Sequence, residues 1–183
     1  KDGSDFGLDQ IISDCLLLLD GGAETTRTVI ARSMLHLANS PTQWELLKKG
    51  ADLEIAVEEF IRYVTPIHNM CRVATEDYVI HGKTIRKGDQ VVLMYSSANR
   101  DLEKFNNPET LDVTRDPNHH IAFGFGTHFC LGASLARLEI KLFYEQLIKR
   151  VESFALAGDP VEMPNAFVYG LASCPMDLTP ELR

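Results

Sequence analysis

The hydrophobic positions in the first part of the chain recur at the spacing of a helix. Residues 8–39 contain no proline and are rich in Leu, Ile and Ala, a composition that predicts one long helix. At about 1.5 Å per residue, this helix would be roughly 48 Å long, enough to cross a domain core. Gly21 and Gly22 lie near its middle, and each glycine weakens a helix by roughly 1 kcal/mol. We therefore expect the glycine pair to interrupt the helix.

Two shorter helices follow. Ser40 and Pro41 are typical of a helix start, and Gly50 is typical of a helix end. A third helix is predicted over about residues 52–64, and Pro66 stops it. The apolar residues that define its buried face are Leu53, Val57, Phe60, Ile61 and Val64.

The pattern becomes β-rich after this third helix. Residues 70–95 contain three β-rich segments, with turn signals at His81-Gly82 and at residues 87–89. Residues 101–119 are polar and irregular. A last helix is predicted over about residues 132–150, with one apolar stripe formed by Leu131, Leu135, Leu138 and Leu142. Short strands and turns follow, so the pattern predicts a mainly α protein with small β-sheets.

Composition and charge narrow the functional classes. The 183 residues are 45% hydrophobic and 24% charged, which suits one globular domain or part of a larger one. The formal net charge of −8 argues against nucleic acid as a partner. The four cysteines are far apart and form no C-x-x-C pair, which argues against a disulfide framework and favours a cytoplasmic location.

The start of the chain suggests a piece of a larger protein. It has no initial Met and enters the helical pattern almost at once. No secretory signal is visible, and the apolar run at residues 15–19 is far too short to span a bilayer.

The stretch FGFGTHFCLG, residues 123–132, is too apolar for an ordinary loop and too rich in glycine for a helix. A thiolate at Cys130 could accept hydrogen bonds from free amides, and the helix that follows would present its positive end to it. Three flanking phenylalanines would exclude water. A protease nucleophile and a zinc site are poor fits, because only His128 lies nearby as a base or second ligand. A buried core cysteine remains the simplest alternative.

The same ten residues resemble the haem-ligand signature of the cytochromes P450, F-G-x-G-x-H-x-C-x-G. The resemblance implies that Cys130 is the proximal thiolate ligand of the iron in haem b. It also implies that Phe123 packs near the thiolate and that His128 donates to a haem propionate. The other signature positions that the resemblance assigns to the cofactor are Gly124, Leu131 and Gly132.

Glu59 and Arg62 form an E-x-x-R pair, which on a helix can be an ordinary exposed ion pair. The P450 resemblance implies instead a buried structural pair that locks the region behind the haem. The family often adds a third basic residue in the irregular segment, and Thr110 stands at the position where we expect it.

The segment GGAETT, residues 21–26, resembles the oxygen-activation motif of the same family. Gly21 and Gly22 would let the helix backbone approach a flat cofactor, and Glu24 and Thr25 would relay protons to dioxygen. Arg72, in a predicted strand, matches a family arginine that reaches a haem propionate.

Together these segments imply a fold and an activity. Residues 1–183 would be the C-terminal haem-binding portion of a single P450 domain, of the soluble bacterial type, with the N-terminal part missing. The activity implied is a haem-thiolate monooxygenase that inserts one atom of O2 into a C–H bond of a hydrophobic substrate. The chain also resembles bacterial P450s that oxidise sterol side chains. Predicted substrate contacts are Ile67, His68, Asn69 and Met70 and the turn at residues 168–171.

The resemblance also implies partners. Electrons would come from a ferredoxin-type donor that docks on the Cys130 side, where Arg137, Lys141, Lys149 and Arg150 are the candidate basic contacts. Half a P450 would expose a long apolar helix, so we expect either a missing N-terminal half that covers it or self-association. A haem-binding remnant or sensor without turnover is the alternative function.

Overall fold

Two helices replace the single long helix predicted over residues 8–39. In the computed structural model, which describes residues 6–182, α1 spans Leu8–Ala23 and α2 spans Thr25–Ala38. The interruption expected at Gly21-Gly22 is instead at Glu24, and both glycines lie within α1. The Thr25 hydroxyl donates a hydrogen bond of 2.8 Å to the Gly21 carbonyl oxygen. Such a bond from a side chain to the preceding turn bends a helix, which explains where the break occurs.

The hydrophobic core lies where α2 meets three further helices: α3 (Pro41–Lys48), α4 (Leu53–Val64) and α6 (Ala133–Arg150). All three were predicted within two residues of these bounds. In α4, the four predicted core residues after Leu53 are fully buried, while Leu53 itself is partly exposed. The core residues with 2% exposure or less are Val29, Leu37, Leu47, Ala56, Val57, Phe60, Ile61, Val64, Val113, Ile140 and Tyr144.

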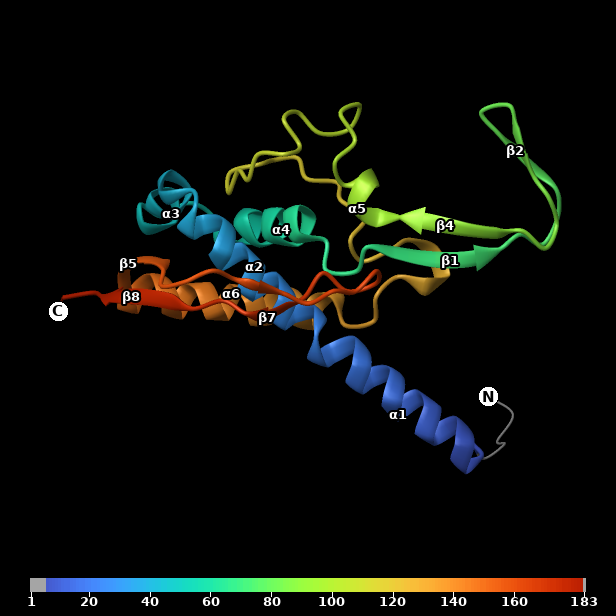
Figure 1. The fold of residues 1–183 in the computed structure, drawn as a ribbon, viewed down its shortest axis with the longest axis horizontal. Coiled ribbons are helices and arrows are strands. Elements are labelled where there is room, and N and C mark those ends of the chain that lie inside the picture. Colours follow the sequence, from blue (N-terminus) through green and yellow to red (C-terminus); the bar gives the residue numbers. More distant parts are fainter. Residues whose placement is uncertain (1–5, 183) are drawn as a thin grey trace.

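Helix α1 extends away from this core, with the N-terminal end at its far tip (Figure 1). None of its residues is buried, and its apolar side chains face solvent all round.

Helix α6 differs from expectation in another way. Its predicted apolar stripe is exposed, with Leu131 at 89% and Leu135 at 59%, whereas Ala133, Ile140 and Tyr144 form its buried face. The core accepts the face that carries Ile140 and Tyr144, which leaves the leucine stripe on the surface.

The predicted strands between α4 and α6 form two antiparallel pairs. β1 (Asn69–Val73) pairs with β4 (Gln90–Met94), and β2 (Tyr78–Ile80) pairs with β3 (Lys83–Ile85). The β2–β3 turn is formed by His81 and Gly82, which both have positive φ, as a two-residue hairpin requires. These strands project from the helices as one arm, with the β2–β3 hairpin at its tip (Figure 1).

The C-terminal region also contains two antiparallel pairs. β5 (Val151–Leu156) pairs with β8 (Met176–Pro180), and β6 (Val161–Glu162) pairs with β7 (Leu171–Ser173). An isolated bridge joins Ile67 to Val168.

The connection between β4 and α6 contains one turn of helix, α5 (Tyr95–Ala98), and a short 3-10 helix, η1 (Gly126–His128). Between these, residues 101–119 form no helix or strand, as predicted.

The expectation of a mainly α protein with small β-sheets is confirmed. Residues 1–5 and 183 of the predicted domain lie outside the described residues. In the part of the chain that the structure describes, no helix is both long enough and apolar enough to cross a membrane.

Candidate functional site

Cys130 lies between η1 and the first turn of α6. Its backbone amide donates to the Phe123 carbonyl oxygen at 2.9 Å, which closes a loop over the intervening residues. Gly124 and Gly126 have φ values of 72° and 71°, a conformation that residues with a side chain rarely adopt. The glycines therefore shape a turn that places the thiol at the positive end of α6.

The phenylalanines around Cys130 were expected to exclude water, and in this chain that expectation is wrong. Cys130 is exposed, Phe125 is 90% exposed and Phe129 is 51% exposed, while Phe123 is half-buried. The loop lies on the surface of the helical core, where Phe123 packs against the core while the Phe125 and Phe129 rings are exposed. This exposure also excludes a buried core cysteine at this position.

A protease nucleophile and a zinc ligand gain no support as roles for Cys130. Among the described residues, no hydrogen bond joins His128 to Cys130, and no group of three or more His, Cys, Asp or Glu side chains could hold a metal ion. A structural zinc site would need about four such ligands. The four cysteines of the chain carry free thiols.

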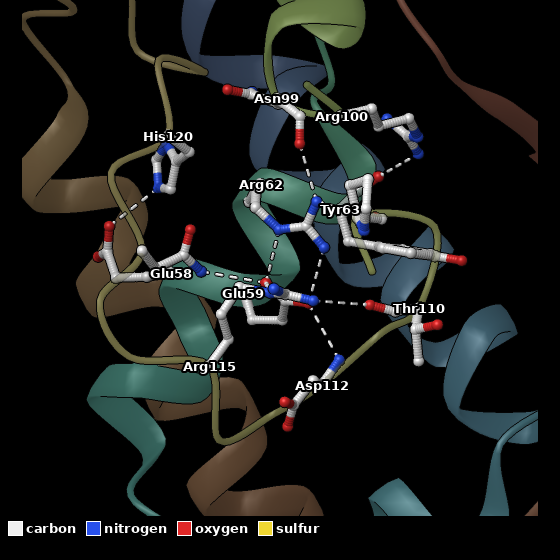
Figure 2. A network of polar contacts seen from close by, with 12 residues as sticks. Glu58, Glu59, Arg62, Tyr63, Asn99, Arg100, Thr110, Asp112, Arg115 and His120 are labelled. Atoms are coloured by element: carbon white, nitrogen blue, oxygen red, sulfur yellow. Dashed lines mark hydrogen bonds and ion pairs between the residues drawn. The ribbon is translucent and has the colours of Figure 1, made fainter. Parts of the chain in front are cut away.

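An ion-pair cluster lies next to the Cys130 loop. The Arg137 guanidinium carbon lies 4.5 Å from the centroid of the Phe123 ring. Arg137 donates two hydrogen bonds to the Glu58 carboxylate, one of them 2.9 Å long. His120 Nε2 lies 3.0 Å from the same carboxylate (Figure 2). The Ala122 amide donates to His120 Nδ1 at 3.3 Å, so His120 Nε2 carries the proton that Glu58 accepts.

Sequence reasoning missed Glu58 and His120, because neither belongs to a motif with a recognisable spacing. Burial would raise the pKa of Glu58, but the hydrogen bonds from His120 and Arg137 outweigh it and lower the pKa from 4.5 to about 2. The hydrogen bond to Glu58 in turn raises the pKa of Arg137. Arg137 is therefore held as a cation beside the Phe123 ring.

Two of the four basic residues expected to contact a redox partner already have acidic partners. Arg137 pairs with Glu58, and Lys141 pairs with Glu54 at 2.8 Å. Lys149 and Arg150 are exposed at the far end of α6.

The predicted pair of Glu59 and Arg62 is confirmed as a buried contact, since both side chains are 0% exposed. Arg62 Nε and Nη2 donate to the Glu59 carboxylate at 2.7 and 2.8 Å. The remaining Arg62 donor reaches the carbonyl oxygens of Asn99 and Pro108, at 2.8 and 3.0 Å. The pair thus joins α4 to the irregular segment (Figure 2).

The third basic residue of this network is Arg115, and its predicted position at Thr110 is wrong. Arg115 Nε donates to Glu59 at 3.0 Å, whereas Thr110 contributes its carbonyl oxygen, which accepts from Arg115 at 3.2 Å. The Asp112 amide and the Asn118 side chain also donate to Glu59, each at 3.0 Å. An irregular segment has no periodicity, so the sequence pattern could not indicate which of its residues turns inward.

The residues of the predicted oxygen-activation motif meet at the break between α1 and α2. Thr25 bonds to the Gly21 carbonyl oxygen, and the Glu24 carboxylate pairs with Arg27 on the next turn. Gly21 and Gly22 both face open space where a side chain would begin. Among the described residues, no hydrogen bond or ion pair joins this group to the Cys130 loop.

Arg72 lies in β1, where it is exposed and donates to the neighbouring Cys71 carbonyl oxygen at 2.9 Å. The two predicted substrate-contact segments lie side by side. His68 donates its amide to Phe167, and Tyr169 donates its amide to Pro66, both at 2.9 Å.

Comparisons with known proteins identify the family of the chain. The family model for Cytochrome P450 matches residues 42–176. The chain belongs to the cytochrome P450 family. This P450 chain is 43% identical over 182 residues to a steroid C26-monooxygenase of Mycolicibacterium smegmatis, covering 98% of this chain and 45% of the relative. It is 46% identical over 150 residues to the biotin biosynthesis cytochrome P450 of Bacillus subtilis, covering 81% of this chain and 38% of that protein.

Solved structures give the same result for the fold. The P450 OxyD of vancomycin-type antibiotic biosynthesis superposes with a TM-score of 0.93 at 36% identity, covering 97% of this chain and 46% of its own. A Bacillus megaterium P450 in complex with testosterone superposes with a TM-score of 0.88 at 35% identity, covering 96% and 49%. The chain therefore has a partial P450 fold and spans about half the length, or less, of these relatives.

The residues around Cys130 fit a haem. A single exposed thiol at a helix N-terminus suits an iron whose other ligands come from a macrocycle. Three exposed apolar side chains, Phe125, Phe129 and Leu131, surround it and would cover a flat apolar ring. Two exposed basic side chains, Arg72 and His128, are available to propionates.

Replacing Arg115 tests its place in the buried network. We expect Arg115→Ala to lower the free energy of unfolding by roughly 1–3 kcal/mol, because it takes a donor from a buried carboxylate. Thr110→Ala is the matched control and should cost less than about 0.5 kcal/mol, because it keeps the backbone carbonyl. Urea unfolding measures both. Equal effects of the two substitutions would contradict the assignment.

The pKa of Glu58 predicts a pH dependence. Because the pKa is lowered from 4.5 to about 2, the ionised carboxylate stabilises the folded state above pH 4.5, and this contribution is lost as the pH falls toward 2. We expect Glu58→Gln to destabilise the protein by roughly 1–3 kcal/mol at pH 7 and by much less near pH 2. Urea unfolding across this range, with the exposed Glu54→Gln as control, measures the effect. A penalty independent of pH would refute it.

Proposed function

We propose that this chain is the C-terminal haem-binding part of a monooxygenase that inserts one oxygen atom of O2 into a C–H bond of a hydrophobic substrate. The observation that carries the proposal is the exposed Cys130 thiol at the N-terminus of α6, within the P450 signature. Cys130, as thiolate, would hold haem b, with Phe123 and the signature positions Gly124, Leu131 and Gly132 around it. Arg72 and His128 would bind the propionates.

Haem held by a cysteine thiolate supplies the activation of O2, in which the sulfur donates electron density that favours O–O cleavage. The chain's own residues would position the cofactor and move protons. Cys130 lies at the N-terminus of α6, and the Arg137 guanidinium lies beside the Phe123 ring of the same loop. Gly21 and Gly22 have no side chain and face open space, so a flat cofactor could approach the α1 backbone closely.

Glu24 and Thr25 would supply the proton. The Glu24 side chain is 45% exposed, so its carboxylate can exchange protons with solvent and turn between Arg27 and the helix break. The Thr25 hydroxyl donates to the Gly21 carbonyl oxygen in this structure. To relay a proton, it would turn away from that oxygen, pass its own proton on, and accept a replacement from the Glu24 side. A protein that only binds haem would not need this pair, so the remnant or sensor alternative is not favoured.

A sterol or related lipid is the proposed substrate class. It is supported by the 43% and 42% identity to steroid C26-monooxygenases of two mycobacterial species and by a structural neighbour in complex with testosterone.

Electrons would come from a ferredoxin-type donor. On the Cys130 side the candidate contacts are Arg137 and Lys141, which pair with Glu58 and Glu54, whereas Lys149 and Arg150 lie at the other end of α6. Four free thiols support a cytoplasmic location.

The exposed apolar surface of α1 would be covered by N-terminal P450 sequence. The proposal is supported by the chain's span of about half of its relatives and by exposures of 54% to 71% along residues 16–19. Self-association through α1 is the alternative, and a monomeric full-length protein would exclude it.

The spectrum of the reduced, CO-bound protein tests thiolate ligation. We expect a strongly red-shifted Soret band in the wild-type protein with haem and its loss in Cys130→Ser, because a hydroxyl does not form a thiolate bond to iron. Cys15→Ser, which replaces another exposed cysteine, should keep the band. A shifted band that survives Cys130→Ser would overturn the assignment of Cys130 as the ligand. A wild type without the shifted band would overturn the proposal and favour the remnant.

The proton-relay role is tested by Thr25→Ala. We expect O2 consumption to continue while the product formed per O2 falls by roughly tenfold or more, since a positioned proton donor contributes about 10²-fold or more. Thr25→Ser should restore coupling, and the neighbouring Thr26→Ala should leave it unchanged. Unchanged coupling in Thr25→Ala would refute the role.

A further inference from the structure

Arg32 is a buried cation that no motif in the chain explains. It lies on α2, about two turns after the helix break, and is 1% exposed. Isolated charges are costly to bury, so such a group must be paired and hydrogen-bonded. Among residues 6–182, the guanidinium satisfies this requirement through one segment, the C-terminal hairpin formed by β6 and β7.

Every partner of the Arg32 guanidinium lies in or beside that hairpin. Arg32 Nε donates to the Tyr169 carbonyl oxygen, and Nη2 donates to the Gly170 carbonyl oxygen at 3.1 Å. Its two terminal nitrogens also pair with the Glu162 carboxylate. The guanidinium carbon lies 3.1 Å from the centroid of the Tyr169 ring, so the planar cation stacks on the aromatic face. Arg32 thus holds both the backbone and the side chain of the turn.

The same turn is held on its other side by the segment that follows α4. The amide of Tyr169 donates to Pro66, the amide of His68 donates to Phe167, and Ile67 forms a bridge with Val168. The His68 and Tyr169 rings are in contact, with centroids 4.9 Å apart. The turn therefore connects α2 with residues 66–69.

Arg32 also affects the charge of the nearby histidines. Burial, followed by the positive charges of Arg32 and Arg100, lowers the pKa of His36 to about 4 and lowers the pKa of His68. His36 is therefore neutral at pH 7. The charge of the Arg32 guanidinium is compensated by the Glu162 carboxylate and by the carbonyl oxygens of Tyr169 and Gly170. The side chains at residues 66–69 and 167–169 are mainly apolar or aromatic.

We propose that Arg32 is a positioning residue that fixes the turn at residues 167–170 against residues 66–69 and thereby sets which hydrophobic substrates the site accepts. The second half of this proposal rests on the proposed function, because these two segments overlap the substrate contacts predicted for it at residues 67–70 and 168–171. A lysine could not replace Arg32, since one ammonium group cannot bond two carbonyl oxygens, pair with Glu162 and stack on Tyr169 at once.

Hydrogen exchange tests the positioning role without any cofactor or substrate. We expect the Tyr169 amide to exchange at least roughly tenfold faster in Arg32→Lys, because the turn loses its anchor on α2. Ser33→Ala is the matched control: it breaks the buried hydrogen bond between Ser33 and Tyr144 on the same helix and should leave Tyr169 unchanged. Glu162→Gln, at an exposed position, should give a smaller increase. Unchanged exchange of Tyr169 in Arg32→Lys and Glu162→Gln would overturn the proposal.

Ligand binding tests the selectivity role in the haem-loaded protein. Testosterone, corticosterone and hexadec-9Z-enoic acid serve as probes, and the shift of the Soret band gives their dissociation constants. We expect Arg32→Lys to change the ratio between the dissociation constants of two of these probes by at least fivefold. Ser33→Ala should leave the ratios between the three constants unchanged. An unaltered ratio, or no binding of any probe to the wild type, would overturn the selectivity role. A wild type without the CO-dependent band would instead refute the proposed function, and hydrogen exchange would still decide the positioning role.

Discussion

The arrangement of the candidate site depends on one buried carboxylate, that of Glu59. A carboxylate removed from water must be compensated almost completely, and donors from Arg62, Asp112, Arg115 and Asn118 do so here. Three of these donors belong to a segment that has no helix or strand to hold it. Arg62 extends the same network to the Asn99 carbonyl oxygen, and the Asn99 side chain accepts from the amide of Ile121, two residues before Phe123. The charge on α4 thus determines the path of the chain into the Cys130 loop.

The neighbouring residue, Glu58, organises the opposite side of α4. Its carboxylate joins His120 and Arg137, so that one helix positions both the approach to the Cys130 loop and the cation that lies on the Phe123 ring. Adjacent acidic residues on a helix point in different directions, and here they serve two networks. The E-x-x-R pair is therefore one of two adjacent groups of ion pairs on α4. Glu59 ties the helix to the irregular segment, and Glu58 ties it to α6.

Periodicity and turn chemistry predicted α3, α4, α6 and the strands of the β arm, because these elements are determined by local pattern. The Cys130 loop was predicted from its motif, and the positive φ values of Gly124 and Gly126 explain why the motif needs glycine. Three features could not be predicted. The helix break depends on a side-chain hydrogen bond of Thr25, the exposed leucines of α6 depend on which face the core accepts, and Arg115 was hidden in a segment without a repeat.

Helix α1 has a consequence for the affinity of whatever binds beside it. None of its residues is buried, so its helical state gains little from tertiary packing, and an isolated helix of 16 residues is marginal in water. Gly21 and Gly22 belong to this helix, and Glu24 and Thr25 continue from it. A ligand that contacts these residues binds only the molecules in which α1 is helical, and its apparent dissociation constant rises in inverse proportion to that fraction. Covering α1 would therefore tighten binding at the helix break without adding any contact to the ligand.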